Sequence, residues 1–173
     1  MTPTPTQPVA PHDLTAEQSV LGSVLLHADS LKQILDVLTT ADFYRKAHQQ
    51  IYARFLELEE SGDAIDLITV QALLKANGEL DAVGGPAYLS ALVDGMPRSV
   101  NIRSYAQIVK EHAKRRQAIK TATQLTEQAQ QAREPAADIA MQATDALLAL
   151  TDVTGKGPVR LSTILADSVT ALE

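Results

Sequence analysis

Apolar side chains recur at intervals of three and four residues along most of the chain, which is the spacing of one face of an α-helix. The pattern predicts five helices in the first hundred residues. Their segments are "DLTAEQSVLGSVLLH", "DSLKQILDVL", a helix from about Arg45–Ala47 to Gly62, "DLITVQALLKANG" and "GGPAYLSALVDG". Val24 and Phe55 lie on two of these stripes, and we expect both side chains in the core.

Residues that cap or stop helices mark the ends of these segments. Thr15 with Gln18 three positions later is a capping-box pattern for the first helix, and Asp29 or Ser30 would cap the second. Gly62, Gly78 and Gly95 are expected to end the third, fourth and fifth helices, and Pro86 suits a first turn. A strand remains an alternative for "AIDLITV", although the residues that follow it keep a helical spacing.

The residue composition of the chain changes at Asn101. Residues 99–132 contain neither Gly nor Pro, and Ala and Gln are abundant, which predicts one long helix over 101–132. "REP" at 133–135 interrupts it, and a second helix is expected over 136–151. Two helices joined by a short break form a helical hairpin. "TDVTGKGPV" then indicates a linker, and a final amphipathic helix follows at 161–173. Its apolar face consists of Leu161, Ile164, Leu165, Val169 and Leu172.

The composition supports an all-α fold of one domain with an appendage. Only 3% of the 173 residues are aromatic, so Leu, Ile, Val and Ala must build the core. The chain has no Cys, which excludes disulfides and thiolate metal sites. No apolar stretch approaches the roughly 18 residues of a membrane span. Four of the eight prolines lie in residues 1–11, which indicates a flexible tail over 1–12 without the pattern of a signal peptide.

The net charge of −6 is distributed unevenly. Residues 1–100 carry six Lys and Arg against 13 Asp and Glu, whereas residues 101–173 carry nine against eight. An acidic first part is a poor surface for nucleic acid and is better suited to a basic protein partner. The basic residues concentrate at Lys110, Lys114, Arg115 and Arg116. These positions are interpreted as a solvated helix face, with a docking patch for an acidic protein or a contact with DNA as the alternatives.

No motif for catalysis or cofactor binding is found in the sequence. "TGKGPVR" has the wrong spacing for a phosphate-binding loop, and neither H-E-x-x-H nor an EF-hand loop occurs. The four histidines are scattered, and His48 is interpreted as a helix cap or a partly buried polar residue. From the residues alone we therefore expect a helical module that is not an enzyme and that holds no metal or cofactor.

Five segments in a fixed order carry a family resemblance. "PHDLTAEQSVLGSVLL", "DFYRKAHQQIY", "IDLITV", "GELDAVGGPAYLSAL" and "NIRSYAQIVKE" together resemble the N-terminal domain of bacterial replicative DNA helicases of the DnaB family. The resemblance covers about residues 11–151. It implies a compact domain at 13–98, a hairpin at 99–152, a linker at 153–160 and a linker helix at 161–173.

The resemblance also implies a function. Family members form homohexameric rings that encircle DNA at the replication fork of the bacterial cytoplasm, where an ATP- and Mg-dependent motor domain unwinds the duplex. Their N-terminal domains pair as dimers that trimerise into a collar, and the collar recruits primase and meets the helicase loader. The motor domain does not occur in this sequence, so an N-terminal fragment without ATPase activity is expected. A freestanding helical adaptor is the alternative.

The resemblance also predicts which surfaces of this chain contact other proteins or other copies. The hairpin is expected to pair with a second copy, and the linker helix is expected to dock on a neighbouring motor domain through the apolar face given above. Lys110, Lys114, Arg115 and Arg116 are candidates for the contact with primase, and the acidic surface of residues 1–100 is the competing candidate. The expected contact residues of the hairpin are Ile102, Tyr105, Val109, Ile139, Ala143, Leu147 and Leu150.

Overall fold

The computed structural model describes residues 9–94, 101–131 and 135–148. These residues form α-helices and short 3-10 helices without a strand, which confirms the all-α prediction. They divide into two compact units, residues 1–116 and residues 117–173. The described part of the first unit is called the head below, and the described part of the second is called the hairpin.

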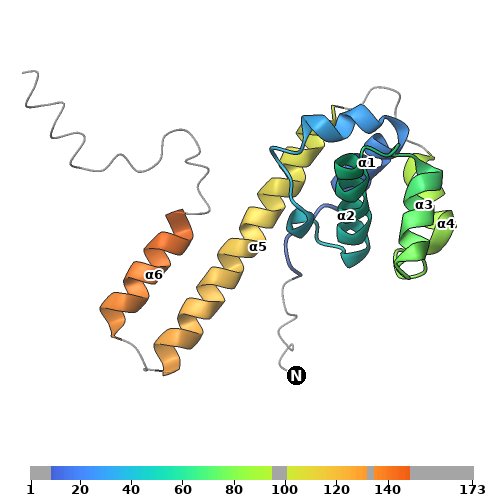
Figure 1. Cartoon of the computed structure of the whole chain (residues 1–173). Coiled ribbons are helices and arrows are strands. Elements are labelled where there is room, and N and C mark those ends of the chain that lie inside the picture. Colours follow the sequence, from blue (N-terminus) through green and yellow to red (C-terminus); the bar gives the residue numbers. More distant parts are fainter. Residues whose placement is uncertain (1–8, 95–100, 132–134, 149–173) are drawn as a thin grey trace, which may run out of the picture. The chain divides into compact units, whose positions relative to one another are not determined.

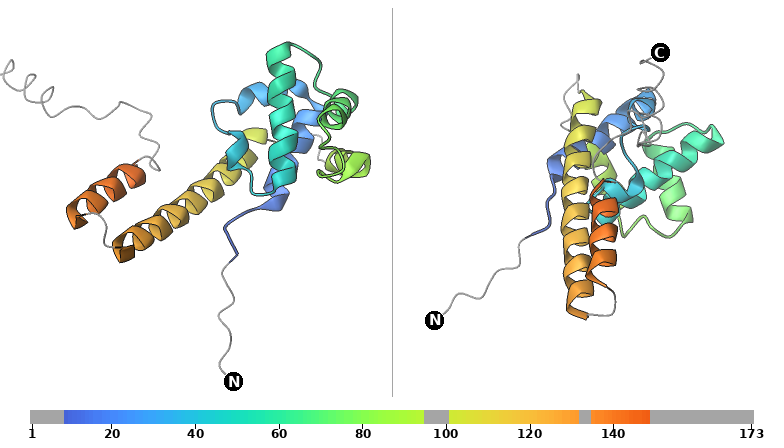
Figure 2. Two further views of the ribbon diagram at one scale, coloured as in Figure 1. Left: turned by 60° about the horizontal axis from the view of Figure 1, so that its bottom comes forward. Right: turned by 90° about the vertical axis from the view of Figure 1, so that its left-hand side faces the viewer.

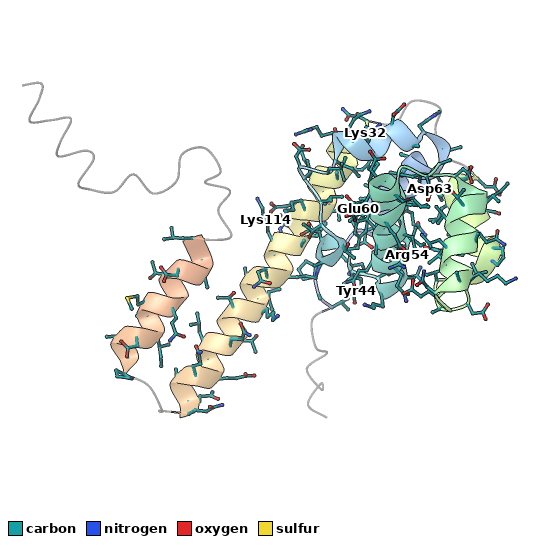
Figure 3. The ribbon with its side chains drawn as sticks, viewed as in Figure 1. Lys32, Tyr44, Arg54, Glu60, Asp63 and Lys114 are labelled. Atoms are coloured by element: carbon teal, nitrogen blue, oxygen red, sulfur yellow. The ribbon has the colours of Figure 1, made fainter. Side chains whose placement is uncertain are left out.

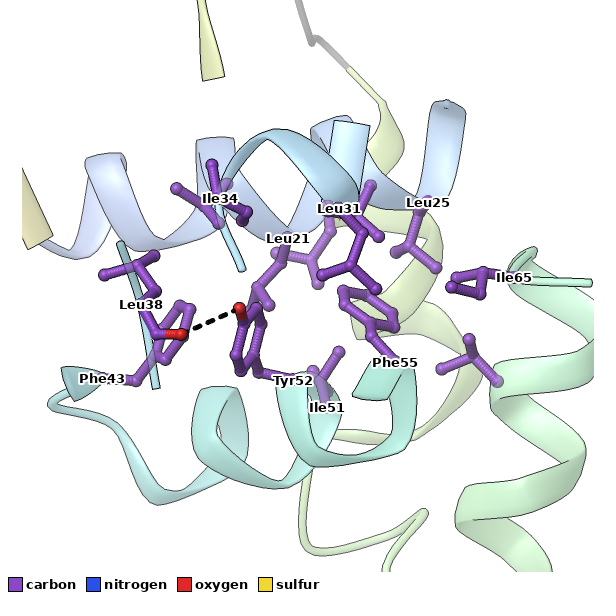
Figure 4. Close-up of a cluster of buried hydrophobic side chains, with 14 of the residues drawn as sticks. Leu21, Leu25, Leu31, Ile34, Leu38, Phe43, Ile51, Tyr52, Phe55 and Ile65 are labelled. Carbon is purple, nitrogen blue, oxygen red and sulfur yellow. Dashed lines mark hydrogen bonds between the residues drawn. The ribbon is translucent and has the colours of Figure 1, made fainter. Parts of the chain in front are cut away.

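The head is built from short helices that enclose one apolar core (Figure 1). Its elements are α1 (Leu14–Leu26), η1 (Ala28–Gln33), η2 (Thr40–Asp42), α2 (Lys46–Ser61), α3 (Leu67–Ala76), α4 (Gly85–Val93) and the first half of α5 (Ile102–Gln131). Val24 and Phe55 are both fully buried, as expected from their stripes. In the core, the rings of Phe43, Tyr52 and Phe55 lie among leucine and isoleucine side chains, and the Tyr52 hydroxyl donates to the Leu38 carbonyl (Figure 4).

The second predicted helix is the main departure from the expected elements. The segment 29–38 forms the 3-10 helix η1 followed by turns, and neither Asp29 nor Ser30 caps it, because η1 begins after His27. Leu31 and Ile34 are both fully buried. Leu31 lies inside η1 and Ile34 directly follows its last residue, so a spacing of three places both side chains on the core side of the segment.

The first helix starts earlier than its predicted cap. Asp13 is the N-cap of α1, and its carboxylate accepts a hydrogen bond from the Ala16 backbone N–H at 2.9 Å. The capping box predicted at Thr15 is therefore wrong, because Thr15 already lies inside the helix. Asp13 is of the residue types preferred as N-caps, and it stands in the same short segment.

The other ends in the head follow their sequence signals. Gly62 and Gly78 adopt the left-handed conformation after α2 and α3, as predicted. "AIDLITV" is not a strand, because Asp66 caps α3 by accepting from the Ile68 and Thr69 backbone N–H groups. At Gly84, just before α4, φ is +106° and an added Cβ would lie 2.9 Å from the Tyr88 Cβ, so only glycine fits. Gly95 lies outside the described residues.

The long helix α5 confirms the predicted element but belongs to both units. Its first half is part of the head, where Ile102, Ala106 and Val109 complete the core. The boundary between the two units falls after Arg116 rather than near residue 99. The reason is the stripe at 102, 106 and 109, which has helical spacing and packs on the head.

The hairpin consists of the second half of α5 and the helix α6 (Ala136–Leu148), which runs alongside it (Figure 2). Thr121 of α5 is buried, Ile139, Ala143 and Ala146 of α6 are half-buried, and the Gln128 amide donates to the Gln142 side-chain oxygen at 3.3 Å. Residues 149–151 of the predicted helix, the linker 153–160 and the helix 161–173 with its docking face lie outside the described residues.

Candidate interaction surfaces and the polar centre of the head

A carboxylate and an imidazole lie inside the head. Glu17 of α1 is 1% exposed and His48 of α2 is fully buried. The His48 Nδ1 lies 2.5 Å from the Glu17 Oε2, and the His48 Nε2 lies 2.6 Å from the Tyr88 hydroxyl of α4. The Glu17 Oε1 also accepts from the Tyr44 backbone N–H at 2.6 Å, and Oε2 accepts from the Arg45 N–H at 3.4 Å.

The hydrogen-bond donors and acceptors around Glu17, His48 and Tyr88 determine where the protons of these three side chains lie. The Tyr88 oxygen accepts from the Gln18 amide and from the Arg45 guanidinium, each at 3.2 Å, so both of its lone pairs are occupied. Its own O–H must then donate to the His48 Nε2, and the imidazole proton sits on Nδ1, where it donates to the Glu17 carboxylate.

This polar centre joins three helices, and its chemistry is structural. The Glu17 carboxylate accepts from the Tyr44 and Arg45 backbone N–H groups, which immediately precede α2, so it ties α1 to the start of that helix. The order carboxylate, imidazole, hydroxyl resembles a nucleophilic triad, but the hydroxyl is held by Gln18 and Arg45. Within the described ranges, no three His, Cys, Asp or Glu residues gather as metal ligands would, and none of the helices could cross a membrane.

Most of this centre was not predicted from the sequence, although the sequence holds a signal for it. Glu17 falls on the apolar stripe of α1 that continues to Val20, Leu21 and Val24, and His48 begins the buried stripe of α2. A titratable side chain inside an apolar stripe must find a partner on folding. His48 was expected to be a cap or partly buried; it is completely buried and hydrogen-bonded through both nitrogens.

The four predicted basic positions do not form one solvated patch. The Lys110 ammonium lies 2.9 Å from the Asp42 carboxylate, and Arg116 donates to two backbone carbonyls of the head. Arg115 is exposed and pairs with Glu111 one turn earlier at 3.1 Å, and Lys114 is half-exposed. Lys110 and Arg116 therefore hold α5 to the rest of the head.

The predicted contact residues of the hairpin also divide into two groups. Ile102 and Val109 are buried in the core of their own head, and Tyr105 is partly buried against that core, so the structure shows these three side chains packed within their own chain. Ile139 and Ala143 are half-buried on α6, and Leu147 is 50% exposed. Leu150 lies outside the described residues.

A different set of apolar side chains is open on the hairpin. Ile119 of α5 and Met141, Leu147 and Leu148 of α6 are each at least half exposed, and we call them the apolar hairpin surface. Between the two helices lies a groove of about 360 Å³ that is lined largely by glutamines. The described residues of α6 include none that is buried, so this helix makes a thin contact with α5.

The predicted acidic surface is visible at the far end of α2. Glu60 and Asp63 are exposed there, at the opposite end of the helix from Tyr44 (Figure 3). Glu57 is balanced by Arg54 at 2.8 Å, and Glu59 lies 3.9 Å from Lys32. The negative charges at Glu60 and Asp63 adjoin the negative end of the helix dipole, so this end presents a net negative potential.

Comparisons with known proteins agree with one another. The family model described as "DnaB-like helicase N terminal domain" matches residues 9–111. Among curated proteins, the "Replicative DNA helicase DnaB" of Geobacillus stearothermophilus is 40% identical over 119 residues, which are 69% of this chain and 26% of that protein. The protein of the same name from Mycobacterium leprae is 41% identical over 117 residues, 68% of this chain and 19% of that protein. The chain thus spans about a quarter or less of the length of these two relatives.

Solved structures show the same fold. The crystal structure of the N-terminal domain of DnaB helicase from Mycobacterium tuberculosis aligns with a TM-score of 0.76 and 35% identity, over 81% of this chain and 99% of that one. A structure described as "a DnaB-Like Replicative Helicase And Its Interactions With Primase" aligns with a TM-score of 0.66 over 93% of this chain and 36% of that one. At 22% identity, the second likeness concerns the fold alone.

Proposed function

This chain belongs to the DnaB-like helicase N-terminal domain family, and from that premise we propose that it is the self-associating, partner-binding part of a replicative DNA helicase. Its role would be to assemble the ring and to recruit other replication proteins. Unwinding and ATP hydrolysis, with ATP and Mg as cofactors, would belong to a motor domain outside the matched region. The protein would act in the bacterial cytoplasm at the replication fork.

The observation that carries this proposal is the apolar hairpin surface. Met141 is 65% exposed and Leu147 is 50% exposed, on a helix that has no buried residue among those described. A short helix gains most of its stability from packing an apolar face, and α6 buries little of its own on α5. A second copy of the chain would cover these side chains, which supports dimers and, through them, the hexameric collar that the family resemblance implies.

Partners other than the chain itself are proposed from the likeness to a solved helicase. The helicase that aligns at 22% identity is described with its interactions with primase, and primase is our first candidate partner, followed by a helicase loader and by DNA held within the complete ring. Lys114 and Arg115 remain the candidates for a basic contact on α5. Glu60 and Asp63 at the end of α2 are the candidates on the acidic surface.

The basic and acidic candidates give opposite results when charges are reversed. Arg115→Glu changes a side chain that pairs only within its own helix, so the head keeps its fold. If α5 contacts primase, this variant lowers the association rate with labelled primase and weakens its salt dependence. Glu60→Lys is the matched reversal on α2. An effect of Glu60→Lys without an effect of Arg115→Glu would assign the contact to the acidic surface.

Self-association is tested by Leu147→Asp. A charge buried against a partner copy typically costs several kcal/mol, so the variant should remain in the smaller species when light scattering is followed across a concentration series. Gln130→Asp is the matched control, because it adds the same charge at an exposed position of α5 that does not line the groove. Circular dichroism checks that α6 still forms. Identical masses for Leu147→Asp and the parent would contradict the proposal.

A further inference from the structure

The N-terminal residues and the middle of α5 meet at Arg116, 105 positions away from Pro11 in the sequence. The Arg116 guanidinium donates to the Pro11 carbonyl at 2.8 Å and to the Asp42 carbonyl at 2.5 Å. It also lies over the ring of Tyr44, 5.7 Å from the ring centre. The other partner of that ring is His12, which stacks on it with 4.2 Å between the ring centres.

The two sides of this contact differ in how firmly they are held. Asp42 is fixed by its own network, because its carboxylate accepts from the Thr39 N–H at 2.7 Å and from Lys110 at 2.9 Å. The N-terminal side carries little packing: Val9 is 71% exposed, and the contact depends on one backbone carbonyl and one stacked ring. Chain termini with few buried contacts open at low free-energy cost.

We propose that residues 9–12 form a releasable strap that secures the turn of α5 around Arg116. With the strap in place, Arg116 is held on two sides and the stacked ring of His12 lies against Tyr44. With the strap released, Arg116 keeps the Asp42 carbonyl, loses the Pro11 carbonyl, and leaves the Tyr44 face open. The tail expected to be flexible over residues 1–12 is thus in contact with the head at Pro11 and His12.

The strap contacts α5 at the end of the head, and this position determines which part of the helix it stabilises. Ile102, Ala106 and Val109 bury the start of α5 in the core, and Lys110 and Arg116 then hold the helix by polar contacts. Arg116 is the last residue of the head unit, and α5 continues from there to Gln131. Anything that binds or removes the first twelve residues would therefore change the stability of α5 at the point where it leaves the head.

Amide hydrogen exchange of the full chain tests the strap. Deleting residues 2–12 removes the Pro11 carbonyl and the His12 ring, and the amides of α5 between residues 113 and 119 should then exchange about tenfold faster, a factor that corresponds to about 1.4 kcal/mol. Deleting residues 2–8 is the matched control, and the strap predicts no change for it. The amides around Val24 and Phe55 report the fold of the core and should stay protected in every variant.

A second variant separates the strap from a general loss of stability. Arg116→Ala removes the Asp42 bond together with the Pro11 bond, so it should speed exchange at least as much as the deletion. Deleting residues 2–12 in that background should add less than it does in the parent, because the Pro11 bond is common to both changes. Arg115→Ala is the control, since that side chain pairs only with Glu111. Additive effects of the two changes, or equal exchange after the short and long deletions, would overturn the proposal. A rise in exchange throughout the core would overturn it as well.

Discussion

Replacing Glu17 by Gln tests whether the buried carboxylate stabilises or destabilises the folded head. The side chain is 1% exposed and accepts from three donors: the Tyr44 N–H, the Arg45 N–H and the His48 Nδ1–H. A glutamine of the same shape offers one oxygen and one amide group. Whichever way it turns, its NH₂ faces one of these donors, so a buried donor is left without an acceptor.

The two opposing effects can be compared in magnitude. Losing a hydrogen bond to a charged group costs about 1.5–3 kcal/mol, and an unsatisfied buried donor costs about 1–3 kcal/mol more. Against this, the neutral amide avoids the desolvation of a buried charge, which is several kcal/mol for an ion without sufficient partners. Glu17 has three donors and lies at the positive end of α2, so its desolvation is already compensated. We therefore expect Glu17→Gln to lower the free energy of unfolding by about 3–5 kcal/mol.

Urea unfolding followed by circular dichroism at 222 nm measures this change. With a denaturant slope of about 1.5–2 kcal/mol/M, the midpoint should fall by about 2 M. Glu57→Gln is the control, because Glu57 is an exposed carboxylate on α2 that pairs only with Arg54, and such pairs contribute at most about 1 kcal/mol. A double-mutant cycle with His48→Asn isolates the pair. An unchanged or higher midpoint for Glu17→Gln would refute the reasoning and show that desolvation dominates.

Three further predictions concern the head. Phe55→Ala empties a fully buried site and should cost about 3–5 kcal/mol in the same urea assay, whereas Ile68→Ala, at a side chain that is 78% exposed, should cost little. Asp66→Ala removes the N-cap of α3 and should cost about 1 kcal/mol at neutral pH. Hydrogen bonds from the Thr69 and Ile68 N–H groups lower the pKa of Asp66, so this difference is present above the ordinary Asp pKa of about 3.9 and disappears as the pH falls through the lower folded value. Burial, and secondarily the charge of Asp42, raises the pKa of Tyr52 to about 12, so its contribution is complete below pH about 10 and is lost as the pH rises to about 12. Tyr52→Phe should remove that alkaline slope, which thermal unfolding between these pH values measures; an unchanged slope would assign it to other groups.

The sequence predicted the helices well where local signals suffice. The α2 helix runs from Lys46 to Ser61 and ends at Gly62. A glycine that follows an amphipathic stripe is a helix-stop signal that can be recognised from neighbouring residues alone. The segment 29–38 was misjudged because an apolar spacing of three fits a 3-10 helix as well as an α-helix. In that segment the tertiary burial of Leu31 and Ile34 decides between the two.

The sequence could not show which other residues a given apolar or polar side chain would contact. Ile102 and Val109 show an apolar stripe, but a stripe does not say whether the chain's own core or a second copy covers it, and here the core does. The same holds for Arg116, whose partners at Pro11 and Asp42 are 105 and 74 positions away. Glu17 and His48 could have been singled out as buried polar positions. Their pairing with Tyr88 could not, because it depends on how α1, α2 and α4 pack together.

The continuity of α5 sets a rule for how its length can vary. Thirty residues run in one helix from Ile102 to Gln131, and at about 1.5 Å per residue they extend over about 45 Å. Each inserted residue would turn everything after it by about 100° around the helix axis, whereas an insertion of seven or eleven residues would return it to within about 20° of its original phase. Between Thr121 and Gln128, which both line the groove beside α6, related chains should therefore keep their length or change it by seven or eleven residues, and a single-residue insertion there should disturb the hairpin and its self-association while the head remains folded.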